Sequence, residues 1–100
     1  MAERITHSTG NVFEDLGFPR EEAENLKVRS TLMAIIRTII EDEGLTQARA
    51  AKLFGVTQPR ISDLVRGKIE LFSIDALVNM VAASGRHVDV SIETPENEAA

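Results

Sequence analysis

The sequence contains no cysteine, which excludes both disulfide bonds and thiolate metal ligands. Its two histidines, His7 and His87, lie far apart, and neither belongs to a ligand pattern such as His-Glu-x-x-His. We therefore expect no metal and no other cofactor. No nucleophile and base are paired in the sequence, and no two acids mark an evident pocket, so an enzyme is not expected.

Aromatic residues are scarce, because the chain has four phenylalanines and neither tryptophan nor tyrosine. No apolar run approaches the ~20 residues that a membrane-spanning helix needs, and the N-terminus lacks the apolar core of a signal peptide. The expected location is therefore the cytoplasm, without a membrane partner. A chain of 100 residues that is 43% hydrophobic can form one small packed domain.

The stretch from Thr46 to Lys68 predicts two helices joined by a tight turn, with Thr46 and Thr57 as their N-caps. Ala51 provides the small contact that two closely crossing helices need, and Gly55 tolerates the positive φ of the turn. Ile61 and Leu64 are expected to pin the second helix to the body of the domain. A helix pair that only packs is the alternative, but this stretch also carries polar residues that packing alone does not require.

These polar residues are the candidates for DNA contact. Gln58 could pair with adenine, and Arg60 with guanine or a phosphate, because their side chains match those groups. Both side chains are expected to point away from the core. Gln47 can hold a backbone phosphate together with the N-terminus of its own helix. Arg66 and Lys68 are equally compatible with ordinary solvated charges. The predicted DNA-binding residues are Gln47, Thr57, Gln58, Arg60, Ser62, Arg66 and Lys68.

The net charge of −5 is unusual for a DNA-binding protein, but it is unevenly distributed. The stretch from Thr46 to Lys68 has five basic residues and one acidic residue, which give a net charge of +4. The rest of the chain has six basic and fifteen acidic residues, which give a net charge of −9. Charges more than about 10 Å away are largely screened at cellular salt, so the local charge governs association with phosphates. The acidic remainder could face a basic partner.

The N-terminal part predicts a flexible tail over residues 1–11 and then a short helix. Asn11 is its expected N-cap, with Glu14 at the third position of a capping box. This segment is too apolar for a free tail, so we expect it to dock on the body, with a partner contact as the alternative. Its apolar residues are Val12, Phe13, Leu16 and Phe18.

Two more helices are predicted around the central stretch. A broad apolar stripe predicts one long helix from Pro19 to Glu43, ended by a glycine. A second stripe predicts a helix that begins at an N-cap, Ser73, and ends at Gly85. The connector over residues 68–72 carries three apolar residues that are expected to anchor it in the core. They are Ile69, Leu71 and Phe72.

The periodicity near the C-terminus is that of a strand, because Val88, Val90 and Ile92 alternate with polar residues. The sequence offers no second convincing strand, and a lone strand leaves its backbone groups unpaired. We therefore expect antiparallel pairing with the same strand of a second copy, with the apolar face on the helical body. The domain would then span residues 12–93, followed by a disordered tail over residues 94–100.

The spacing Gln-x3-Ala-x3-Gly-Val, followed by Gln-x2-Ile-Ser, resembles the Cro/phage-repressor (XRE) type of helix-turn-helix. The segments EEAENLKVRS and GKIELFSIDALVNM are similar to the HigA-like branch of XRE antitoxins from bacterial toxin–antitoxin pairs. The resemblance extends from about Val12 to Ile92. It implies an all-α, five-helix bundle that forms a homodimer, and the alternation near the C-terminus adds the strand that would pair across this homodimer.

The same resemblance implies a function. HigA-like proteins bind the operator of their own operon and neutralise a RelE/HigB-like toxin, a ribosome-dependent mRNA endonuclease. The sequence leaves two alternatives open. One is a stand-alone XRE-type regulator without a toxin, and the other is a protein-interaction module that neutralises a partner without binding DNA.

Overall fold

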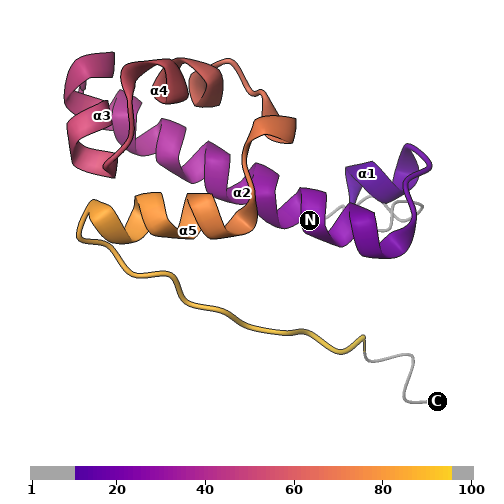
Figure 1. The fold of residues 1–100 in the computed structure, drawn as a ribbon. Coiled ribbons are helices and arrows are strands. Elements are labelled where there is room, and N and C mark those ends of the chain that lie inside the picture. Colours follow the sequence, from indigo (N-terminus) through magenta and orange to yellow (C-terminus); the bar gives the residue numbers. More distant parts are fainter. Residues whose placement is uncertain (1–10, 96–100) are drawn as a thin grey trace.

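A computed structural model of the 100-residue chain describes residues 11–95, which contain five α-helices and one short 3-10 helix (Figure 1). The all-helical class and the five predicted helices are thus confirmed. None of these helices combines the length and the apolar character that a membrane crossing requires. The elements in order are α1 (Val12–Asp15), α2 (Arg20–Asp42), α3 (Gln47–Phe54), α4 (Gln58–Val65), η1 (Ile69–Leu71) and α5 (Ile74–Ala83).

Side-chain caps start three helices at the predicted positions. The hydroxyls of Thr46, Thr57 and Ser73 each accept a hydrogen bond from the backbone N–H three residues further on, at 3.1, 3.4 and 3.1 Å. Each cap satisfies an N–H group that no carbonyl of its own helix can reach. The starts of α3, α4 and α5 are therefore fixed by local chemistry.

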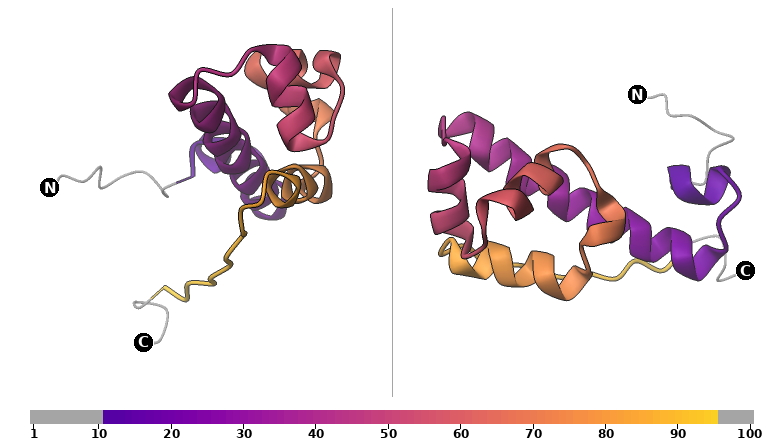
Figure 2. Two further views of the ribbon diagram at one scale, coloured as in Figure 1. Left: turned by 90° about the vertical axis from the view of Figure 1, so that its left-hand side faces the viewer. Right: turned by 45° about the horizontal axis from the view of Figure 1, so that its top comes forward.

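The core lies between α2 and the three helices that follow it. The 23-residue α2 is the axis of the fold, with α5 along one side and α3 and α4 across its C-terminal part (Figures 1 and 2). The buried core side chains are Met33, Ile36, Ile40, Ala50, Ala51, Phe54, Ile61, Leu64, Phe72, Leu77, Met80 and Val81. Of the three predicted connector anchors, Phe72 is buried, Ile69 is half-buried, and Leu71 is exposed.

The short α1 docks on the N-terminal half of α2, away from α3 and α4 (Figure 1). The buried Asn11 holds it there: its Oδ1 accepts from the N–H groups of Phe13 (2.9 Å) and Glu14 (3.2 Å), and its Nδ2 donates to the Ala23 carbonyl (3.0 Å). The predicted cap and docking are confirmed, but three of the four apolar side chains that predicted the docking are exposed. Asn11 itself is an anchor rather than the last residue of a tail, and the rest of the predicted N-terminal tail lies outside the described residues.

The C-terminal segment, residues 86–95, contains no strand in the single chain, so the predicted strand and its pairing with a second copy stay predictions. The segment leaves α5 and runs away from the helices (Figure 2). Val88, Val90 and Ile92 are 38%, 76% and 87% exposed, so the expectation that they lie on the helical body is wrong. The physical reason is that a ladder needs a second strand, and the described part of one chain does not provide it.

Candidate nucleic-acid interface

The turn between α3 and α4 is made by Gly55, which has the predicted positive φ, +70°. The N–H of Val56 donates to the carbonyl of Ala51 at 3.0 Å and closes the end of α3. A Cβ at Gly55 would lie 3.4 Å from the Cβ of Ala83, so the turn also lies close to the end of α5. The backbone conformation at Gly55 sets the direction of α4 relative to α3, and the close approach places the turn against α5.

One side of α4 is buried and the other is exposed. Ile61 and Leu64 are in the core, as predicted, whereas Gln58 and Arg66 are exposed. Ser62 is half-buried between these two sides. The first turn of α4 therefore presents an uncovered amide to solvent, and its last turn is followed by an uncovered cation.

The start of α3 is also exposed. Gln47 is the first residue of this helix, directly after its cap, Thr46, and both are exposed. Arg49 and Lys52 add two exposed cations to the same helix. The N–H groups at the start of a helix and nearby cations both attract phosphate oxygens. This arrangement is compatible with the predicted phosphate contact of Gln47.

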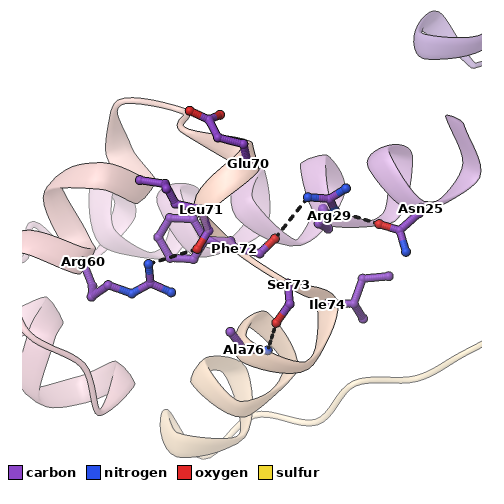
Figure 3. A pocket seen from close by; sticks show the side chains of 9 residues that line it. All are labelled: Asn25, Arg29, Arg60, Glu70, Leu71, Phe72, Ser73, Ile74 and Ala76. Carbon is purple, nitrogen blue, oxygen red and sulfur yellow. Dashed lines mark hydrogen bonds between the residues drawn. The ribbon is translucent and has the colours of Figure 1, made fainter. Parts of the chain in front are cut away.

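The Arg60 side chain does not point away from the core, contrary to our expectation. Its guanidinium carbon lies 4.1 Å from the centroid of the buried Phe72 ring, and its Nη1 donates to the Leu71 carbonyl at 3.0 Å (Figure 3). Such a cation–π contact contributes about 0.5–1 kcal/mol at an exposed site. Arg60 thus ties the first turn of α4 to η1 and the residue after it.

Lys68 and Asp63 form an ion pair with an Nζ–Oδ1 distance of 3.9 Å. Both side chains are partly exposed, and such pairs typically contribute less than about 1 kcal/mol. Lys68 therefore has a carboxylate neighbour, which reduces the local positive charge that it can offer to a phosphate. Its DNA contact stays a prediction, as do those of Thr57, Ser62 and Arg66.

Arg29 on α2 was not predicted, although it lines the same open pocket of about 410 Å³ as Arg60 (Figure 3). Its Nε donates to Asn25 Oδ1 at 2.7 Å, and its Nη1 donates to the carbonyls of Ile69 (3.2 Å) and Phe72 (3.4 Å). A sequence signal exists: Arg29 follows the buried Leu26 by one helical turn, so it interrupts the apolar stripe of α2 with a cation.

Comparison with known proteins assigns the fold. A family model described as a helix-turn-helix domain matches residues 12–93. The chain is also similar to a solved structure whose name assigns it to the XRE family of transcriptional regulators, with a TM-score of 0.69 and 29% sequence identity over 79% of this chain and 89% of that one. The comparison with curated proteins gives no match. The predicted XRE-type helix-turn-helix is confirmed, whereas the HigA-like branch stays a prediction.

Proposed function

The chain belongs to the helix-turn-helix family whose model matches residues 12–93, and from this premise we propose that it represses its own operon by binding the operator as a homodimer. DNA-binding regulation follows from the family and from the likeness to an XRE-family regulator. The observation that carries the proposal is the two-sided burial of α4, with Ile61 and Leu64 in the core and Gln58 exposed. Within this proposal α4 is the recognition helix.

Gln58 is the best candidate for reading a base. It is the first residue of α4, and the N-terminal residues of a recognition helix usually reach the base edges of the major groove. A glutamine amide can make two hydrogen bonds to adenine. Gln47 would hold a backbone phosphate at the start of α3, and Thr57 and Arg66 would contact the backbone from the two ends of α4. Ser62 and Lys68 would add contacts at the groove rim.

The test uses two DNA duplexes of equal length, one from the region upstream of the gene and one with the same bases scrambled. We expect Gln58→Ala to lose about 1–3 kcal/mol of preference for the upstream duplex while its binding to the scrambled duplex stays unchanged. Asn79→Ala, which removes an exposed amide from α5, is the matched control. An unchanged preference in Gln58→Ala would refute base reading by Gln58, and a wild-type protein without preference would refute the repressor proposal.

The homodimer is proposed to form through residues 87–93. The exposed, alternating Val88, Val90 and Ile92 support this, because an extended backbone without a partner among residues 11–95 can pair with the same segment of a second copy. Two-fold antiparallel pairing would also set the separation of the two recognition helices. Two half-sites on one face of DNA require the two recognition helices to be about 34 Å apart, which is one turn of the double helix.

Truncation before His87 tests this contact. We expect the truncated chain to sediment as a monomer and to lose operator affinity, while its circular dichroism still shows the helices. Val90→Pro should act in the same direction, because proline lacks the N–H that a ladder requires. Val90→Thr retains the N–H and serves as the control. A truncated protein with the wild-type dimer dissociation constant would place the interface elsewhere.

We further propose that the protein is the antitoxin of a type II pair. The similarity of its flanks to HigA-like antitoxins supports this, and so does the net charge of −9 outside Thr46–Lys68, which suits a basic RelE/HigB-like toxin. If the product of the neighbouring gene arrests growth when it is expressed alone, co-expression with this protein should restore growth, and the two proteins should purify as a complex. A neighbouring product that is harmless on its own would favour the stand-alone regulator. Neutralisation without any DNA binding would favour the pure interaction module.

A further inference from the structure

Two guanidinium groups without a carboxylate partner line the pocket beside the first turn of α4 (Figure 3). Arg60 reaches it from α4 and Arg29 from α2, and their acceptors are backbone carbonyls and one amide oxygen. Neither arginine forms an ion pair with an acid of residues 11–95. The carboxylate of Glu70, the only acid among the described lining residues, points away from both groups in this view. Within the described residues, neutral groups alone hold these two half-buried cations.

The pocket still has unused donors. Arg60 uses Nη1 for the Leu71 carbonyl, and its Nε and Nη2 make no hydrogen bond to another described residue. The Ser73 hydroxyl accepts from the N–H of Ala76, which leaves its own proton available at the start of the ten-residue α5. Guanidinium edges, hydroxyl groups and helix N-termini all bind phosphate oxygens. The stack on Phe72 also orients the Arg60 plane before any ligand binds, which lowers the entropy lost on binding.

We propose that this pocket binds one phosphodiester group of duplex DNA, on the strand that borders the groove entered by α4. Arg60 lies in the first turn of α4, so its guanidinium stands beside the groove when the start of that helix approaches the bases. In this arrangement Arg60 positions the protein on the backbone instead of reading guanine. Arg29 brings the long helix α2 into the same contact. The inference rests on the proposed function, because it requires α4 to be the recognition helix.

Binding to the upstream and scrambled duplexes is measured between about 50 and 200 mM salt for the wild type, Arg29→Gln and Arg60→Gln. Since a phosphate carries no sequence information, both variants should weaken binding to the two duplexes by the same factor. Each should also reduce the slope of log K against log salt by about 1, the loss of one phosphate contact. Because both arginines hold the same phosphate, the double variant should reduce the slope no further. Lys27→Gln, which removes an exposed cation of α2 outside this pocket, is the matched control and should leave the slope unchanged.

Both arginines also donate to carbonyls of η1 and of the residue after it, so thermal unfolding is measured for each variant. Glu70→Gln keeps the test decisive if an arginine variant fails to fold. Glu70 is exposed, and removing its charge should tighten binding to both duplexes several-fold without a change in stability. Glu21→Gln, at the other end of α2 from α3, is the control and should not change affinity.

The outcomes separate the two proposals. A wild-type protein that binds neither duplex overturns the proposed function, and the phosphate pocket with it. A wild type that prefers the upstream duplex, together with folded arginine variants of unchanged affinity and salt slope, overturns the pocket alone. Unchanged affinity in Glu70→Gln overturns it in the same way. An arginine variant that weakens only the upstream duplex would show that the side chain reads a base, which also overturns the phosphate assignment.

Discussion

Replacing Gly55 tests how the recognition helix is fixed to the rest of the fold. Gly55 has φ +70°, a left-handed conformation that costs a residue with a Cβ about 1–2 kcal/mol. A Cβ there would also lie 3.4 Å from the Cβ of Ala83 on α5, at the tight end of ordinary carbon contacts. A substitution at Gly55 therefore combines backbone strain with crowding against α5.

Two other glycines separate these effects. Gly44 and Gly67 have φ of +61° and +76°, and a Cβ at either would have no neighbour within 4 Å. Gly44→Ala and Gly67→Ala should therefore lower the free energy of unfolding by strain alone, about 1–2 kcal/mol. Gly55→Ala should lower it by slightly more. Gly55→Val adds two methyl groups beside Ala83, so we expect roughly 1–3 kcal/mol from strain and about 1 kcal/mol or more from crowding.

Thermal and urea unfolding followed by circular dichroism measures these differences. For a domain of this size, 1 kcal/mol corresponds to roughly 4–8 °C in Tm. Gly55→Asn should be milder than Gly55→Val, because asparagine visits the left-handed region more readily. A Gly55→Val protein with wild-type stability would refute the left-handed turn. Equal losses in Gly55→Ala and Gly44→Ala would show that the approach of Ala83 has no energetic effect.

Three further substitutions address other anchors of the fold. Asn11→Ala removes the cap of α1 and its bond to α2, so it should lower stability by about 1–2 kcal/mol and speed amide exchange in α1. Phe72→Ala should lower stability by about 3–5 kcal/mol in urea unfolding. Phe72→Leu should lower it by less than about 1.5 kcal/mol, yet weaken binding to both duplexes, because Arg60 loses its ring.

The sequence predicted those parts of the fold that depend on neighbouring residues. Thr46, Thr57 and Ser73 cap their helices at the expected positions, and Gly55 adopts the expected conformation. Each of these features depends on one side chain and the backbone within a few residues of it. The same locality explains why the bounds of α2 differ from the prediction by only one residue at each end.

The parts that the sequence did not predict depend on contacts between distant residues. Arg60 meets Leu71, eleven residues along the chain, only because η1 folds back beside α4. Arg29 donates to the carbonyls of Ile69 and Phe72, which lie 40 and 43 positions further along the chain. The polar pattern identified Arg60 as a candidate, but it could not show that the side chain stacks on a buried ring. The alternation of apolar and polar residues in the C-terminal segment likewise predicts an extended backbone, but it does not identify the strand with which that backbone pairs.

The position of α5 links the two halves of the proposed function. Its last residue, Ala83, lies close to the Gly55 turn, and the C-terminal segment begins three residues later, at Arg86. In the proposed dimer, the path from the paired strands to the recognition helix therefore runs through a short stretch at the end of one helix. This connection is short, and the N–H of Arg86 donates to the Val81 carbonyl at 3.3 Å, so the dimer contact would set the spacing of the two α4 helices. This would make operator affinity depend on residues such as Val90, which lie far from the DNA and touch no base.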